Sequence, residues 1–262
     1  MAERLGAHAK RLKTVRELLT VKGSREQGRF LIEGPALLAE ARASSIELDD
    51  VFASRRAYEQ VPQIPELEAS GVPVWIVDGR TIERLSDVES PTGVLAVARR
   101  RLAELGEVLS RAAPVLVLAD LNDPGNCGTL VRSADAFGAS GVIFGRHGVD
   151  PYHPKLVRSA VGSLFRLPIA LASPWEVADA AKAAGRAVIG LAADGSALAL
   201  EAFASGVLII VGHERRGLGP WEAICDSKVA IPMRGGAESL NAAVAGSIAL
   251  YEAGKLRKMG DL

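Results

Sequence analysis

The sequence predicts an α/β protein with a small N-terminal domain and a larger C-terminal domain built on a parallel sheet. From Pro114 onwards, short apolar strands alternate strictly with helical segments, which is typical of a parallel sheet with helices on both faces. The strand expected at 114–121, PVLVLADL, is almost continuously apolar, as a strand buried on both faces should be. The first hundred residues have the texture of a separate, compact α/β unit.

In the N-terminal domain, a basic helix is predicted over residues 4–21, because its leucines and Val15 lie near helical spacing. Short apolar runs then predict strands at 29–34, 48–54, 72–79 and 93–100, and a helix at 35–44 with Pro35 in its first turn. Residues 102–113 are either a rigid helix or a hinge. We therefore expect a first domain at 1–103, a linker at 104–113 and a second domain at 114–262.

In the C-terminal domain, the same patterns predict strands at 114–121, 141–145, 166–171, 186–193, 206–214 and 228–233, and helices at 129–139, 153–165, 174–185, 219–227 and 238–259. In the helix at 153–165, Leu156, Val161 and Leu164 are expected to point inward. In the last helix, the stripe of Leu240, Val244, Ile248 and Tyr251 is expected to pack on the sheet, and Glu238 or Ser239 to cap the start.

Charge gives only local hints of a partner. The chain has 262 residues and a formal net charge of zero, so its total charge does not indicate nucleic-acid binding. Residues 1–30, however, hold eight basic and three acidic side chains, and Arg99–Arg101 form a second basic cluster. These clusters are candidate phosphate contacts, although a basic run is equally compatible with a solvated helix face.

Several classes of protein are disfavoured. The two cysteines are far apart and no CxxC motif exists, so no metal site is expected. The N-terminus lacks the apolar core of a signal peptide, and no run approaches the roughly 20 apolar residues of a membrane span, so we expect a cytoplasmic protein. A nicotinamide-dependent enzyme is disfavoured because no GxGxxG follows the first strand of the sheet, and no phosphate-binding GxxxxGK[ST] motif is present.

Polar loops follow the ends of three strands in the C-terminal domain, where open parallel sheets bind ligands. In NDPGNCG, Asn126 precedes Arg132 by about a turn and a half of the next helix. Asn126 could be only a helix cap and Arg132 only a surface charge. In VGHERRGLG, Gly212 permits close approach to the backbone, and Glu214 is either functional or paired with a neighbouring arginine.

The third loop, IPMRGGAESLN, carries more hydrogen-bonding groups than a helix cap requires. Capping explains one polar residue, but not Glu238, Ser239 and Asn241 together after a pair of glycines.

In this order, the segments NDPGNCGTLVRSADAFGASGVIF, VLIIVGHERRGLG and VAIPMRGGAESLNAAVAGSIALYE resemble the motifs of the SpoU (TrmH-type) RNA ribose 2′-O-methyltransferases of the SPOUT superfamily. The segments RFLIEGPALLAEA and SPTGVLAVARR resemble the small L30e-like substrate-binding domain of many members. The resemblance implies a deep trefoil knot in the parallel-sheet SPOUT domain, a homodimer, and S-adenosylmethionine as cofactor.

The resemblance also implies roles for individual residues. The cofactor is expected against Gly190, Leu191, Gly212, Ile231, Met233 and Leu240. The catalytic set is expected to be Asn126, Arg132, Glu214, Ser239 and Asn241. Because a guanidinium stays protonated, we expect Arg132 to clamp a substrate phosphate and polarise the hydroxyl, rather than to act as a base.

Structured RNA is the expected partner, with ribosomal RNA favoured by the two-domain layout. The expected RNA contacts are Arg11, Lys13, Arg29, Glu33, Lys155 and Arg158. A transfer-RNA substrate is the nearest alternative, because the catalytic motifs do not separate the two. A non-catalytic RNA-binding protein is a further alternative, against which the complete set of polar motif residues argues.

Overall fold

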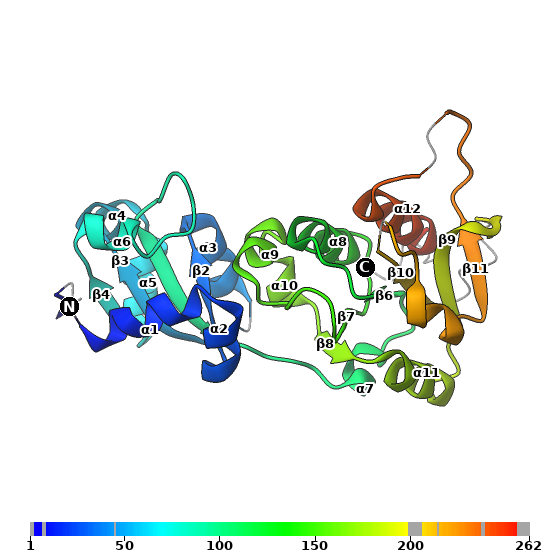
Figure 1. Cartoon of the computed structure of the whole chain (residues 1–262). Helices are drawn as coiled ribbons and strands as arrows, with labels where there is room; N and C mark the ends of the chain where they lie inside the picture. Colours follow the sequence, from blue (N-terminus) through cyan, green and yellow to red (C-terminus); the bar gives the residue numbers. More distant parts are fainter. Residues whose placement is uncertain are drawn as a thin grey trace. The chain divides into compact units, whose positions relative to one another are not determined.

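The computed structural model describes residues 3–6, 9–44, 46–198, 206–213, 215–236 and 239–255 (Figure 1). Two compact units are present. The first comprises Met1–Arg101 and Tyr152–Arg166, and the second comprises Leu102–Pro151 and Leu167–Leu262. The first unit therefore contains a segment that a division into contiguous domains at 1–103 and 114–262 leaves out.

The first unit is built on a mixed sheet of five strands. In spatial order these are β1 (Glu3–Arg4), β4 (Val74–Ile76), β3 (Leu48–Ala53), β5 (Val94–Arg99) and β2 (Arg29–Glu33). Strand β4 runs parallel to β1 and β3, whereas β5 runs antiparallel to both β3 and β2. The four predicted strands are confirmed, and β1 is an addition that its two exposed residues did not reveal.

Six helices come from the N-terminal part of this unit: α1 (Lys10–Leu18), α2 (Val21–Gln27), α3 (Pro35–Ala43), α4 (Arg55–Gln60), α5 (Gln63–Ala69) and α6 (Gly79–Glu83). The single helix predicted at 4–21 is wrong, because the chain breaks at Thr20. The Thr20 hydroxyl accepts a hydrogen bond from the Gly23 N–H at 3.1 Å and so caps a second helix.

The inserted segment carries α9 (Pro154–Ser159) and α10 (Ser163–Arg166). It packs in the first unit through Tyr152 and Phe165, whose ring centroids lie 4.6 and 6.0 Å from that of Phe30. The continuous helix predicted at 153–165 is wrong, because Val161 and Gly162 both have positive φ angles, of 48° and 84°. Val161 is consequently 44% exposed instead of packed inward, whereas Leu156 and Leu164 are buried as predicted.

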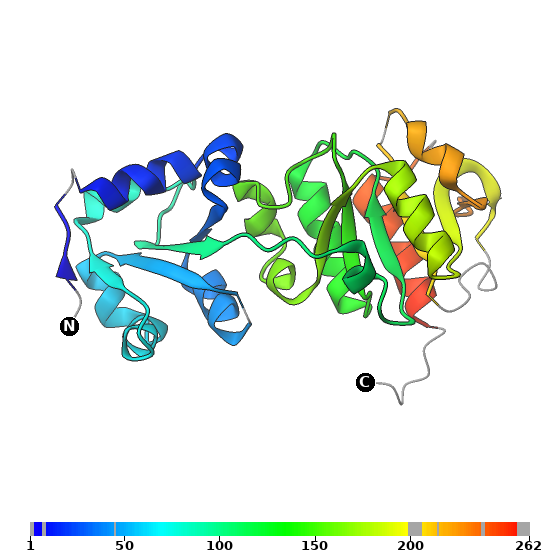
Figure 2. The same cartoon turned by 90° about the horizontal axis from the view of Figure 1, so that it is seen from below.

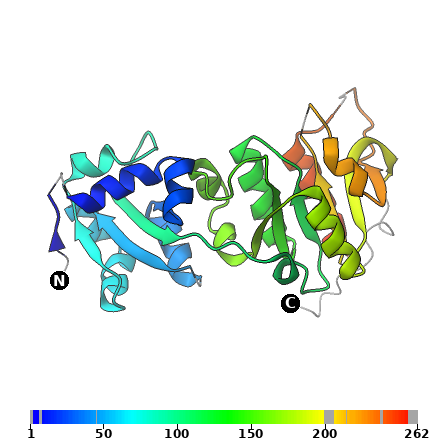
Figure 3. The same cartoon turned by 60° about the horizontal axis from the view of Figure 1, so that its bottom comes forward.

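The second unit is built on a six-stranded parallel sheet, as predicted (Figures 2 and 3). Its strands are β6 (Val115–Leu118), β7 (Gly141–Gly145), β8 (Ile169–Ala172), β9 (Val188–Ala197), β10 (Leu208–Val211) and β11 (Ser227–Ala230). Their spatial order is β11-β9-β10-β6-β7-β8, and every neighbouring pair is parallel. The carboxyl ends of all six strands therefore lie along one edge of the sheet.

Helices cover both faces of this sheet. One face packs against α8 (Pro124–Ala136) and α12 (Ala242–Gly254), and the other against α7 (Leu105–Val108), α11 (Pro174–Ala183) and the 3₁₀ helix η2 (Gly219–Ile224) (Figure 1). The helix predicted at 219–227 is thus a shorter 3₁₀ helix. The segment at 102–113 contains only the single turn of α7.

Helix α12 buries a different face from the predicted one. Its buried residues are mainly small, and a Cβ on Gly246 would collide with Leu130 and lie 2.9 Å from Val211 Cγ2. The helix therefore approaches α8 and β10 closely through glycine and alanine. The predicted inward stripe instead faces outward in part, since Val244 and Tyr251 are 48% and 49% exposed.

Among the described residues, no helix has the length and apolar character needed to cross a membrane.

Candidate functional site

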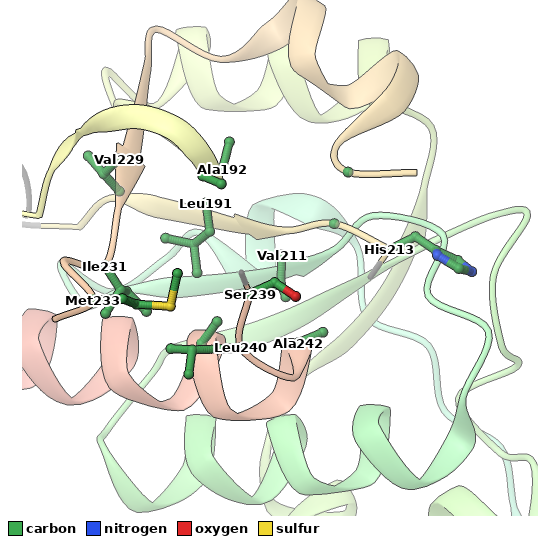
Figure 4. Close-up of a pocket in the computed structure, with 14 residues that line it drawn as sticks. Leu191, Ala192, Val211, His213, Val229, Ile231, Met233, Ser239, Leu240 and Ala242 are labelled. Carbon is green, nitrogen blue, oxygen red and sulfur yellow. The ribbon is translucent and has the colours of Figure 1, made fainter. Parts of the chain in front are cut away.

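A mostly apolar cavity of about 230 Å³ opens at the carboxyl edge of the six-stranded sheet (Figure 4). Its walls come from the ends of β9 and β10, the chain after β11, and the entry into α12. Five of the six residues predicted to bind a cofactor line it: Leu191, Gly212, Ile231, Met233 and Leu240. An apolar cavity bordered by a few main-chain polar groups is the usual form of a small-molecule site.

Gly212 is required by the backbone around it. A Cβ at this position would lie 2.5 Å from the carbonyl carbon of Gly217 and 2.8 Å from the Leu218 nitrogen. Backbone hydrogen bonds between His213 and Gly217, at 2.8 and 2.9 Å, hold the two segments at this close distance. The main chain of Gly212 is therefore left open to the cavity without a side chain in front of it.

Gly190, the sixth predicted cofactor residue, does not line this cavity. A Cβ on Gly190 would meet Leu218 Cδ1 at 2.5 Å and Cys225 Sγ at 2.9 Å, on the side of the sheet covered by η2. Because successive residues of a strand face opposite sides, Leu191 points to the cavity and Gly190 away from it. Gly190 gives η2 the room to pack on β9.

A hydrogen bond joins the first and third polar loops. The Asn241 Nδ2 donates to Asn126 Oδ1 at 3.2 Å, across 115 residues of sequence. Asn241 also caps α12, since its Oδ1 accepts from the N–H groups of Ala243 and Val244 at 2.8 and 3.3 Å. The predicted cap by Glu238 or Ser239 is therefore wrong. Glu238 itself lies outside the described residues.

Helix α8 starts earlier than predicted, and Asn126 is not its cap. Asp123 takes that place, because its carboxylate accepts from the Asn126 N–H at 2.6 Å, and Pro124 follows in the first helical turn. The Asn126 side chain is consequently free of capping and turns towards Asn241. The alternative reading of Asn126 as a helix cap is thereby removed.

Arg132 lies in the middle of α8 with an exposed side chain. It forms no hydrogen bond or ion pair with any residue that the structure describes. The neighbouring Ser133 hydroxyl is 2.7 Å from that of Ser247, which ties α8 to α12 at this level. A rigid helix thus presents an exposed cation, suited to an anionic ligand such as a phosphate.

The other two predicted catalytic residues differ in what is known of them. Ser239 is exposed and lines the cofactor-sized cavity, directly before Leu240. Glu214 lies outside the described residues.

Two residues at this edge were not singled out from the sequence. Asp120 adopts a left-handed conformation with a φ of 51° after β6, and its carboxylate accepts from the His147 N–H at 3.0 Å and from Trp221 Nε1 at 2.9 Å. His213 lines the cavity directly after Gly212. The only sequence signal for either residue is its position immediately after a buried strand.

All six residues predicted to contact RNA lie in the first unit, and four of them have carboxylate or hydroxyl partners. Arg11 pairs with Asp50 at 2.8 Å and stacks over the Trp75 ring, 4.4 Å from its centroid. Further pairs are Arg29 with Asp49, Arg158 with Asp87, and Glu33 with the Ser86 hydroxyl.

Arg11 and Arg29 are brought together at one small pocket, with Asp50 between them. Lys13 and Lys155 are exposed, and Lys13 makes only a long contact of 3.9 Å with Glu17. Among the described residues, no cluster of three or more histidine, cysteine or acidic side chains has the arrangement of a metal site.

Comparison with protein families assigns both parts of the chain. Residues 113–251 match the model of the SpoU rRNA methylase family, and residues 9–96 match the MRM3-like substrate binding domain. The first match includes every described residue of the cavity and of the Asn126–Asn241 pair.

Individual relatives agree with these matches. The chain is 32% identical over 249 residues to the 23S rRNA (guanosine(2553)-2′-O)-methyltransferase RlmP of Bacillus subtilis, covering 94% of this chain and 96% of that protein. It is 41% identical over 181 residues to the 23S rRNA (uridine(2479)-2′-O)-methyltransferase of Streptomyces viridochromogenes, covering 66% of this chain and 63% of that protein. The crystal structure of the SpoU methyltransferase AviRb from the latter organism, in complex with AdoMet, superposes with a TM-score of 0.85 at 32% identity, covering 95% of this chain and 98% of that one.

Proposed function

Since the chain belongs to the SpoU rRNA methylase family, we infer that it is an S-adenosylmethionine-dependent enzyme that methylates a ribose 2′-hydroxyl in large-subunit (23S) ribosomal RNA. The observation that carries this inference is the hydrogen bond between Asn126 and Asn241 beside the apolar cavity, with the exposed Arg132 on the same helix as Asn126. These features unite a cofactor-sized cavity with groups able to hold a phosphate and a ribose.

The cavity fits S-adenosylmethionine in its chemistry. Leu191, Ile231 and Leu240 offer apolar walls for a base, and the bare main chain at Gly212 offers polar groups to the rest of the molecule. When bound there, the cofactor supplies an electrophilic methyl group on a sulfonium.

The side chains of the site are then left to hold the ribose and to assist loss of its proton. Arg132 binds the phosphate next to the target ribose and polarises the 2′-hydroxyl, while it stays protonated. Asn126 and Asn241 fix the loop from which this helix starts, and Ser239 hydrogen-bonds the ribose at the mouth of the cavity. Glu214 is assigned to the same group from the family motif alone.

The first unit is the second contact for RNA in this proposal, consistent with its match to a substrate binding domain. Lys13 and Lys155 offer exposed ammonium groups to phosphates. Arg11 and Arg29 are held by carboxylates at one pocket, so RNA would have to compete with Asp49 and Asp50 for them. These two arginines are therefore assigned to shape-dependent contacts rather than to general attraction.

A homodimer is a further part of the proposal. Residues of α8 and α12 line an open groove of about 470 Å³ that includes Phe137, Val244, Ile248 and Tyr251; we call it the α8–α12 groove. Large apolar side chains are exposed along it, which favours burial against a second copy of the chain. We also propose that the enzyme works in the cytoplasm, where bacterial ribosomal RNA is assembled.

The experiment that tests this function uses S-adenosylmethionine labelled in its methyl group. Unmodified 23S ribosomal RNA and bulk transfer RNA are incubated separately with the wild-type protein and with Arg132→Ala. We expect label in the ribosomal RNA only, resistant to alkali because it sits on a ribose oxygen, and lost in the variant. Label in the transfer RNA would replace the substrate, and cofactor binding with no transfer to either RNA would favour a non-catalytic RNA-binding protein.

A further inference from the structure

His213 occupies a boundary position at the carboxyl end of β10. Its main chain lines the cofactor-sized cavity next to Gly212, and its side chain is half-buried. Figure 4 shows the imidazole pointing away from Leu191, Ile231 and Met233, which form the apolar walls. The ring is therefore not part of the wall that faces a cofactor.

The imidazole is held in one orientation and one neutral tautomer. The Arg215 N–H donates to His213 Nδ1 at 3.1 Å, so this nitrogen is the acceptor and the proton of the neutral ring is on Nε2. The backbone at the same position is fixed by the two hydrogen bonds with Gly217. A hydrogen-bond donor, Nε2–H, is thus presented in a fixed direction without needing to be ordered on binding.

Strand register shows what lies beside this donor. Val211 of β10 is paired with Leu118 of β6, and the Ala119 N–H donates to the Val211 carbonyl at 2.9 Å. Two residues further along each strand, His213 reaches the level of Asp120, where the loop that leads to Asn126 begins. His213 therefore stands between the cofactor cavity and the loop that starts helix α8.

From this position we propose that His213 is a substrate-binding residue, whose Nε2–H donates to an oxygen of the sugar–phosphate backbone of the target nucleotide. The proposal rests on the function inferred above, because it requires that an RNA ribose is brought to this edge. The contact does not read the base. It holds the nucleotide from the β10 side, while Arg132 holds it from helix α8.

Two substitutions separate this role from a purely structural one. His213→Asn keeps an acceptor near the place of Nδ1 for the Arg215 N–H, but it is too short to replace Nε2. His213→Gln does the reverse, since its terminal amide reaches the place of Nε2 as a donor and leaves the Arg215 N–H without its acceptor. A substrate contact and a loop-holding contact therefore predict opposite rankings of the two variants.

The test measures kcat/KM for ribosomal RNA, the dissociation constant for S-adenosylmethionine by calorimetry, and the melting temperature of each variant. We expect His213→Asn to lose about tenfold or more in kcat/KM, with cofactor affinity and melting temperature unchanged. We expect His213→Gln to lose about threefold or less.

Three results would overturn the inference. They are an unchanged kcat/KM in His213→Asn, a larger loss in His213→Gln than in His213→Asn, or a parallel loss of cofactor affinity. A wild-type protein that binds the cofactor but methylates neither RNA would overturn the proposed function, and this inference with it. An active wild type with an equally active His213→Asn would overturn only the inference.

Discussion

Asn241 uses both ends of its side-chain amide, and the two ends serve different purposes. The oxygen caps α12 by accepting from two backbone N–H groups, and the nitrogen donates to Asn126. An aspartate has the capping oxygen but lacks the donor, so the two contributions can be separated with one pair of variants.

We expect Asn241→Asp to keep its free energy of unfolding within about 0.5 kcal/mol of the wild type, because aspartate is an equally good cap. Its methyl transfer should fall strongly, because the bond to Asn126 is lost. Asn241→Ala should lose both the activity and about 1 kcal/mol of stability. Urea unfolding and methyl transfer at saturating cofactor measure the two effects, and a fully active Asn241→Asp would contradict the assigned role of the bond.

Cys225 is predicted to be chemically inert at neutral pH. Its thiol packs between β9 and η2, and burial raises its pKa to about 11, with further effects in the same direction from Glu222 and Asp226. Because the thiolate is the reactive form, alkylation by iodoacetamide at about pH 8 should be far slower than for a free cysteine. The rate should rise steeply as the pH approaches 11, and rapid labelling of native Cys225 at about pH 8 would contradict this.

At the scale of single residues, the sequence located polar groups but not their partners. Asn126 and Asn241 were expected at the same edge because each follows a parallel strand, and the structure brings them into contact. Asp120 was missed because its significance comes from Trp221, which is 101 positions away. Gly190 was placed in the cavity one residue out of step, since a one-residue shift along a strand changes the face.

At the scale of elements, the contact of α12 with its neighbours depends on the absence of a side chain at Gly246. An added Cβ would collide with Leu130 of α8 and press on Val211 of β10. Glycine in a helix normally costs about 1 kcal/mol relative to alanine, so a beneficial substitution would be expected from helix propensity alone. The close packing predicts the opposite sign.

We expect Gly246→Ala to lower the free energy of unfolding by about 1–2 kcal/mol, because overpacking outweighs the gain in propensity. Gly106→Ala in α7 is the matched control, since its added Cβ would meet nothing within 4 Å. The control should be neutral or slightly stabilising. Chemical denaturation of both variants measures the difference, and a stabilised Gly246→Ala would mean that α12 packs less tightly than described.

The same close packing explains why the buried face of α12 was predicted wrongly. Hydrophobic periodicity assigns the largest apolar residues to the interior, and Val244 and Tyr251 lie at the right spacing. The interior here instead takes the small residues, because they allow the helix to approach the sheet. A similar limit applies to the helix at 153–165, whose break at Val161 is a backbone conformation with no sequence signal in a β-branched residue.

At the scale of the whole molecule, the strands of the second unit were predictable and their order was not. Continuous apolar runs such as Val115–Leu118 indicate buried parallel strands, but they do not indicate that β10 lies between β9 and β6. The inclusion of Tyr152–Arg166 in the first unit depends on contacts with Phe30 that are remote in sequence. The trefoil knot stays a prediction from the family resemblance.

The α8–α12 groove gives the last prediction, which concerns assembly. If two copies of the chain meet there, Val244→Glu places a charge in a buried interface without disturbing the fold, because this side chain is 48% exposed in the single chain. We expect the wild type to be a dimer by light scattering and the variant to be a monomer with reduced methyl transfer.

Trp175→Glu is the matched control for this substitution. Trp175 is 65% exposed on α11, which covers the opposite face of the sheet, so the same charge there should leave a dimer intact. A monomeric wild type would reject the proposed homodimer. A dimer that survives Val244→Glu but not Trp175→Glu would move the interface to the face of the sheet that carries α11.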